Sequence, residues 1–116
     1  MTDTIQVETV GDRTVLVCSG DIDLTQADEL RRAIARGARS ADPTVVVDVA
    51  EARMLDSTTL GVLLHGSNNC RDMGGRLVVA GARGLVAKAM RATRLDHILE
   101  LAPDVQTALT APVASE

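Results

Sequence analysis

Residues 44–49 have the sequence Thr-Val-Val-Val-Asp-Val, a β-branched run in which polar and apolar side chains hardly alternate. A strand with one face in water alternates apolar and polar residues, whereas a strand covered on both faces is apolar almost throughout. Strands covered on both faces occur mainly in parallel sheets, because the connecting helices pack on the sheet faces. The run therefore predicts a central parallel strand of an α/β domain.

The N-terminal part of the chain predicts an antiparallel hairpin. Residues 4–10 alternate, with Ile5 and Val7 on one face, which indicates a strand near an edge of the sheet. Residues 13–19 are more continuously apolar and predict a more buried strand. The turn at Gly11 and Asp12 is short enough to join the two strands directly.

Helices and strands alternate through the rest of the chain. Helices are predicted over residues 25–39, 57–72 and 85–92, further strands over 76–80 and 98–101, and a last helical turn or two ends at residue 109. The order β-β-α-β-α-β-α-β-α predicts an α/β fold with a mixed, mostly parallel sheet, an antiparallel N-terminal hairpin and helices packed on the sheet.

Each of the three longer helices has an apolar stripe at spacings of three and four residues, which indicates the face packed on the sheet. The stripes are Ala27, Leu30, Ile34 and Ala38 in the first helix, Leu60, Leu63, Leu64 and Ser67 in the second, and Val86, Ala89, Met90 and Thr93 in the third.

Length and composition exclude several classes of function. With 116 residues, the chain predicts one domain over residues 4–109 and a flexible C-terminal tail over 110–116. The chain has no Phe, Tyr or Trp on which single-stranded bases stack. Its net charge of -4 provides no excess of Lys and Arg for the phosphates of a duplex. We therefore expect no direct nucleic-acid partner.

Cys18 and Cys70 are far apart in sequence and form no closely spaced metal or redox motif, so we expect two buried thiols in a reduced compartment. The first residues lack the basic and apolar regions of a signal peptide. No apolar run approaches the roughly 20 residues of a membrane span. These features predict a cytoplasmic protein with no membrane span, no metal and no cofactor.

The most informative polar residues follow the central strand. Asp56 or Ser57 is a good N-cap for the next helix, and capping alone is the simplest interpretation. However, Asp56 to Thr59 contain more hydroxyl groups than one cap needs, and they lie at the carboxyl end of a parallel strand, where α/β folds place their sites. The outer side of this helix is predicted to be small and polar and to suit a docking partner. It carries Thr58, Gly61, His65 and Asn69.

A serine at a helix N-terminus is also suited to carry a phosphoryl group. The free backbone N–H groups and the positive end of the helix dipole stabilise an anion there. Phosphorylation of Ser57 would add about -1.5 to -2 charges beside Asp56. This change would repel a docked partner without rearranging the core.

Two other classes of function are weaker alternatives. A hydrolase with Ser57 as nucleophile needs a base, but His65 is about 12 Å further along the same helix and His97 is in a distant segment. A receiver-like domain phosphorylated on Asp48 lacks an acidic pair for Mg²⁺ after its first strand. We therefore interpret Asp48 as a strand-end acid bonded to nearby backbone.

The segment from Asp56 to Val62, with Ser57, Thr58, Leu60 and Gly61, resembles the signature loop of STAS domains, specifically the bacterial anti-sigma factor antagonists. Three other segments resemble the family in the same order. These are Gly20 to Asp23, Gly74 to Val79, and Val86 to Leu95 followed by Ile98 and Leu99. The resemblance covers residues 4–109.

The resemblance implies a non-enzymatic protein that binds an anti-sigma factor with serine kinase activity and so frees a sigma factor. It implies that the kinase phosphorylates the serine after the Asp, here Ser57, with Thr58 as the second candidate, and that a serine phosphatase reverses the modification. Asp23 matches an acidic position near the phosphorylated serine and the partner. The residues expected to contact the partner are Asp23, Asp56, Ser57, Thr58, Thr59, Gly61 and His65.

The chain departs from the family at Thr59, where the family usually has Gly. STAS domains also occur as subunits of lipid-transport ABC complexes and as tails of anion transporters. The alternative expectation is therefore a STAS subunit of a different complex, such as a lipid-transport ABC system, that does not act on sigma factors.

Overall fold

The computed structural model describes residues 4–110, and its elements follow the predicted order. They are β1 (Thr4–Val10), β2 (Arg13–Ile22), α1 (Leu24–Ala38), β3 (Thr44–Leu55), α2 (Ser57–Asp72), β4 (Arg76–Ala80), α3 (Gly84–Ala92), the 3-10 turn η1 (Leu95–His97), β5 (Glu100–Ala102) and α4 (Val105–Thr110).

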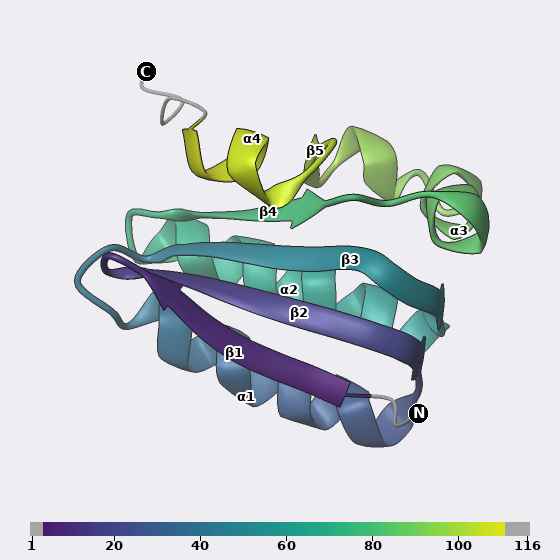
Figure 1. The fold of residues 1–116 in the computed structure, drawn as a ribbon, viewed down its shortest axis with the longest axis horizontal. Helices are drawn as coiled ribbons and strands as arrows, with labels where there is room; N and C mark the ends of the chain where they lie inside the picture. The colour runs from purple at the N-terminus through teal and green to yellow at the C-terminus, as the bar shows by residue number, and fades with distance from the viewer. Residues whose placement is uncertain (1–3, 111–116) are drawn as a thin grey trace.

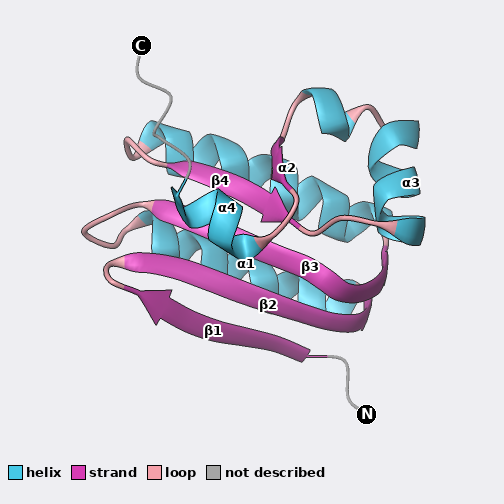
Figure 2. Ribbon diagram, turned by 45° about the horizontal axis from the view of Figure 1, so that its top comes forward, coloured by secondary structure: helices cyan, strands magenta, loops and turns pink. Residues whose placement is uncertain are grey.

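One five-stranded sheet organises these elements (Figure 1). Its strand order is β1-β2-β3-β4-β5, in which β1 is antiparallel to β2 and the other neighbours are parallel. The helices α1 and α2 lie on one face of the sheet and α4 lies on the other (Figure 2). The predicted mixed, mostly parallel sheet with an antiparallel N-terminal hairpin is confirmed.

The core is built from aliphatic side chains on both faces of the central strands. Val45, Val46 and Val47 are all 0 % exposed, as the β-branched run predicts. Val45 and Val47 belong to the main core beneath α1, α2 and α3, whereas Val46 belongs to a smaller cluster beneath α4. The sheet is therefore covered on both faces at its centre, as in other α/β domains.

The apolar stripes of the helices are largely buried. Every predicted stripe residue of α1 is buried, and so are Leu60, Leu63 and Ser67 of α2, together with Val86 and Met90 of α3. Thr93, predicted on the inner side of the third helix, is instead exposed, because α3 ends at Ala92 and Thr93 is its C-cap.

The strand β1 lies at the edge of the sheet, as its alternation predicts, but the two apolar residues on one face of it differ in exposure. Ile5 is 8 % exposed but Val7 on the same face of β1 is 53 % exposed. The strand β1 forms the edge of the sheet, so α1 covers its beginning and leaves Val7 open. Exposure at this position depends on the neighbouring helix and not on the alternation of the strand.

The C-terminal part differs from the sequence prediction in its boundaries. The last strand begins at Glu100 and not at residue 98, because Leu95–His97 forms a 3-10 turn after Arg94, which has a φ of 62°. Thr110 is the last residue of α4, and the rest of the predicted C-terminal tail lies outside the described residues.

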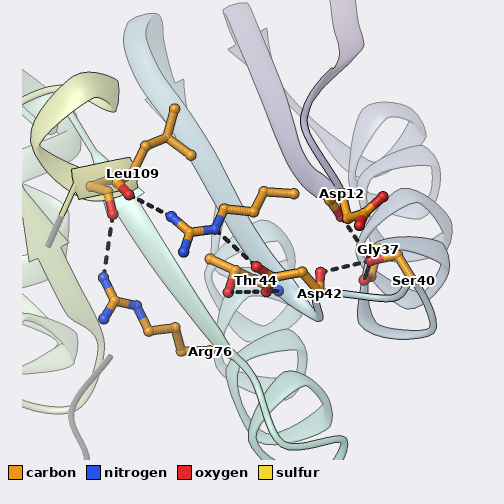
Figure 3. Close-up of polar contacts among 9 residues, drawn as sticks. Asp12, Gly37, Ser40, Asp42, Thr44, Arg76 and Leu109 are labelled. Atoms are coloured by element: carbon orange, nitrogen blue, oxygen red, sulfur yellow. Dashed lines mark hydrogen bonds and ion pairs between the residues drawn. The ribbon is translucent and has the colours of Figure 1, made fainter. Parts of the chain in front are cut away.

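Polar contacts at the amino ends of the parallel strands attach α4 to the sheet (Figure 3). The Arg13 guanidinium pairs with Asp42 at 2.9 Å and donates to the Leu109 carbonyl, and Arg76 donates to another carbonyl of α4 at 3.3 Å. The Thr44 hydroxyl, followed by Arg13, holds the pKa of Asp42 below its usual value. These basic side chains stabilise the C-terminal end of a short helix, and α4 is thereby held at the end of the sheet opposite Ser57.

Candidate functional site at the carboxyl end of the sheet

Asp56 and Ser57 lie where β3 ends and α2 begins. Asp56 is the N-cap of α2, and its carboxylate accepts hydrogen bonds from the backbone N–H and the hydroxyl of Thr59, both at 2.8 Å. Ser57 is the first residue of the helix, and the side chains of Ser57 and Thr58 are exposed. Both hydroxyl groups are therefore accessible to another protein.

Thr59 points in the opposite direction. Its side chain is 0 % exposed, and its hydroxyl oxygen lies 3.3 Å from the Ile22 carbonyl at the end of β2. The expectation that Thr59 contacts a partner directly is therefore wrong for its side chain. The third position of the helix faces the sheet here, so Thr59 braces the start of α2 against β2.

Asp23 caps the neighbouring helix in a similar way. Its side chain accepts from the Thr25 N–H at 3.0 Å, and the Gln26 side chain accepts from the Asp23 N–H at 3.2 Å, which completes a capping box at the start of α1. The pairing of β2 with β3 continues to their last residues, so Asp23 and Asp56 follow directly paired positions. The structure thus brings two helix N-termini and two carboxylates together at the carboxyl end of the sheet.

The remaining predicted partner residues lie along the outer face of α2. Gly61 and His65 are exposed, and they follow Ser57 at four and eight residues, so these three residues form one row on the helix. A Cβ added at Gly61 would meet no atom within 4 Å, so the glycine leaves open space on this row. His65 also lines a groove of about 590 Å³ between α1 and α2.

Three exposed apolar side chains at this end were not found from the sequence. Leu24 is 69 % exposed, Met54 is 50 % exposed and Leu85 is 60 % exposed, and they lie where β2, β3 and β4 lead into α1, α2 and α3. We call Leu24, Met54, Ser57, Thr58 and Leu85 the carboxyl-end surface. Large apolar side chains grouped at one end are typical of a protein-binding surface. The sequence signal that could have indicated an exposed Leu24 is its position directly after Asp23, the N-cap of α1.

The alternative catalytic functions gain no support from the geometry. His65 is exposed on α2, two helical turns beyond Ser57, and His97 is exposed in η1. The Asp48 carboxylate accepts from the Ala50 N–H at 3.0 Å, which confirms its interpretation as an acid bonded to nearby backbone. Within residues 4–110 there is no group of three side chains able to hold a metal ion.

The two cysteines are buried and free, as predicted. Burial, with smaller contributions from Asp48 and Glu29, raises the pKa of the Cys18 thiol to about 12. Burial alone raises the pKa of the Cys70 thiol to about 11. Both thiols therefore stay protonated near neutral pH, and neither provides a thiolate for catalysis or metal binding.

Replacing Asp56 by alanine is expected to destabilise the domain by about 0.5–2 kcal/mol, because α2 loses its N-cap. Urea denaturation measures this loss. Asp56→Asn is the matched control, since asparagine caps helices about as well as aspartate. Equal stability of Asp56→Ala and wild type would contradict the capping role of Asp56.

No helix within the described part of the chain is long and apolar enough to cross a lipid bilayer. A family model described as "Mlab, STAS domain" matches residues 5–101. Among curated proteins, none matches the chain.

Solved structures with the same fold include two anti-sigma factor antagonists. One, from Mycobacterium paratuberculosis, is 27 % identical, with 94 % of this chain and 92 % of that chain covered and a TM-score of 0.81. The other, SpoIIAA in its unphosphorylated form, is 18 % identical, with 91 % and 93 % covered and a TM-score of 0.80. SpoIIAA, a Bacillus cell fate determinant, has also been solved in a phosphorylated form.

A sulfate transporter family protein from Wolinella succinogenes also resembles the chain. It is 15 % identical, with 82 % of this chain and 80 % of that chain covered and a TM-score of 0.70. The fold is thus shared by proteins of different roles. The family model covers most of the chain, so the chain belongs to the STAS domain family.

Proposed function

We propose that this STAS domain is an anti-sigma factor antagonist, which binds an anti-sigma factor with serine kinase activity through its carboxyl-end surface and thereby frees a sigma factor. One observation carries the proposal: the exposed Ser57 lies at the same end of the sheet as exposed apolar side chains, on a chain that is 27 % identical, over 94 % of its length, to a mycobacterial anti-sigma factor antagonist. The domain acts by binding and needs no cofactor of its own.

The proposed switch is phosphorylation of Ser57. The kinase transfers the terminal phosphoryl group of ATP to the Ser57 hydroxyl oxygen, and a serine phosphatase later hydrolyses the new phosphate ester. The backbone N–H groups of Ser57 and Thr58 belong to the first turn of α2 and have no partner within the helix, so they favour an anion at this position. Because the side chain is exposed, the added group leaves the core unchanged.

The effect of the phosphoryl group on binding follows from its neighbours. It adds about -1.5 to -2 charges beside Asp56 and near Asp23, which already make this edge acidic. A partner that covers the exposed Leu24 and Met54 would also have to bury these charges away from water, and this lowers its affinity. Phosphorylation therefore releases the partner, and dephosphorylation restores binding.

Incubation of the wild type with its cognate kinase and ATP should add the mass of one phosphoryl group, read from the intact protein. Ser57→Ala should gain none, and Thr58→Ala should gain the same mass as the wild type, because both variants keep the surface but only the first lacks the acceptor. An equal gain in Ser57→Ala and wild type would refute Ser57 as the acceptor. A gain abolished only by Thr58→Ala would move the acceptor to Thr58.

A second candidate function keeps the fold and changes the partner. The matching family model is described as "Mlab, STAS domain", a description that does not mention sigma factors, so a STAS subunit of another complex, such as a lipid-transport ABC system, is the second candidate. Affinity capture from cells that naturally express the chain distinguishes the two functions. Recovery of an anti-sigma factor that is lost with Ser57→Asp supports the first, whereas recovery of an ABC transporter subunit identifies the second. The first function requires ATP and a sigma factor, both of which are found in the cytoplasm, so it implies a cytoplasmic protein.

A further inference from the structure

The strand β1 leaves one edge of the sheet open (Figure 2). Within residues 4–110 it pairs only with β2, and every residue from Gln6 to Val10 is exposed. An unpaired strand edge presents a row of backbone N–H and C=O groups, and proteins normally protect such an edge against pairing with another chain. The two edges of this sheet differ in that protection.

The opposite edge is protected and the β1 edge is not. The strand β5 has three residues and is followed at once by Pro103, and short edge strands next to proline resist further pairing. By contrast, β1 has seven residues, Thr-Ile-Gln-Val-Glu-Thr-Val, with no Lys, Arg or Pro and with Glu8 as its single charge. The β1 edge therefore lacks the features that protect the β5 edge, and its backbone groups can pair with another strand.

The hairpin determines which backbone groups of β1 point outward. Its loop has two residues and begins with Gly11 at a φ of 63°, so Val10 and Arg13 close the hairpin as a hydrogen-bonded pair. Because hydrogen-bonded and non-hydrogen-bonded pairs alternate in antiparallel strands, Gln6 and Glu8 also bond to β2. The N–H and C=O groups of the odd-numbered residues therefore face outward. These residues are Ile5, Val7 and Thr9.

We propose that β1 pairs antiparallel with β1 of a second copy of this chain, with Val7 at the twofold axis, so that two sheets join into one. Val7 is the middle residue of β1, so this register overlaps the whole strand and matches the outward-facing groups of both copies. Ile5 then lies opposite Thr9 of the second copy. In this register, Ile5 forms a hydrogen-bonded pair with Thr9 of the second copy, and Val7 forms one with Val7 of the second copy.

The side chains are complementary in the same register. Val7, which is 53 % exposed, meets Val7 of the second copy and gains an apolar neighbour. Glu8 meets Gln6 of the second copy, so the only carboxylate on the strand faces an amide that can donate to it and not a second carboxylate. The register therefore places no two like charges opposite each other, and this favours the pairing of two identical strands.

The helices leave room for this arrangement. The helix α1 packs mainly over β2, and β2 would lie three strand spacings, or about 14 Å, from its copy. Packed helices need only about 8–10 Å between their axes, so the two α1 helices do not clash. Ser57 follows β3, the third strand from the joined edge, so the carboxyl-end surface stays accessible whether or not the proposed function is correct.

Sedimentation equilibrium over a range of protein concentrations tests the pairing. The wild type should dimerise, and Val7→Lys should weaken the dimer by roughly tenfold or more, because two like charges then meet at the axis. Val10→Lys is the matched control, since Val10 lies opposite Thr4 of the second copy and its dimer should persist. A wild type that stays monomeric, or a dimer unaffected by Val7→Lys, would overturn the proposal.

Two changes at Gln6 test the register. Gln6→Lys places a cation opposite Glu8 of the second copy twice and should tighten the dimer roughly two- to thirtyfold, whereas Gln6→Glu places two carboxylates together and should weaken it. Hydrogen exchange gives an independent measurement: the amides of Ile5, Val7 and Thr9 should become protected as concentration rises. A dimer in which these three amides remain unprotected would show that a different surface pairs.

Discussion

Replacing Ser57 by aspartate is expected to weaken binding of the anti-sigma factor by about tenfold to a hundredfold, since a fixed negative charge is then added to the carboxyl-end surface. The exposed position of Ser57 at the first turn of α2 predicts that the domain stays folded. Aspartate is favourable near a helix N-terminus, so the variant should be at least as stable as the wild type. Titration calorimetry with the anti-sigma factor measures the loss.

Ser57→Asn is the matched control for that prediction. Asparagine has nearly the size and polarity of aspartate but no charge, so it should keep most of the affinity if electrostatic repulsion is the cause. Equal weakening by both variants would mean that side-chain size and not charge decides binding at Ser57. Unchanged affinity in Ser57→Asp would contradict both the charge mechanism and the placement of the partner on this surface.

Replacing Leu63 by alanine is expected to lower the free energy of unfolding by about 2–5 kcal/mol. Leu63 is 0 % exposed in the main core beneath α2, and the surrounding side chains fill the space only partly once the isobutyl group is removed. Chemical denaturation at constant m-value measures the loss. This is a large part of the roughly 5–15 kcal/mol by which domains of this kind are stable.

Leu64→Ala provides the comparison within the same helix. Leu64 is only half-buried at the margin of the core, so its truncation should have a clearly smaller effect than that of Leu63. Equal losses in the two variants would mean that the inner face of α2 is rotated from the one described. The folded fraction of Leu63→Ala should still accept phosphate at Ser57, because Ser57 is exposed and is not part of the core.

Most of the fold was predictable because its determinants are local. The run Val45 to Val47 predicted burial on both faces, and the stripe spacing in α1 and α2 predicted the faces packed on the sheet. Boundaries were less predictable, since β3 continues to Leu55 through residues without strong strand preference. Its pairing with β2 continues that far, and this ladder extends the strand.

The candidate site was predictable in part for the same reason. Asp56 and Ser57 were recognisable as the start of a helix after a buried strand, and the structure places them there. Thr59 was assigned to the partner surface because its hydroxyl resembles its neighbours in sequence, but the helix turns it toward Ile22. A difference of two positions along a helix changes the direction of a side chain by about 200°, so adjacent hydroxyls need not share a surface.

Residues near one another in the chain were enough to establish the α/β order, the buried strands and the capped helix that begins at Ser57, because burial patterns and caps depend on local spacing. Only the tertiary structure decided that Leu24, Met54 and Leu85 are exposed at the same end of the sheet and that β1 forms an open edge. The physical reason is that exposure depends on which elements lie beside a residue, and those neighbours come from distant parts of the chain.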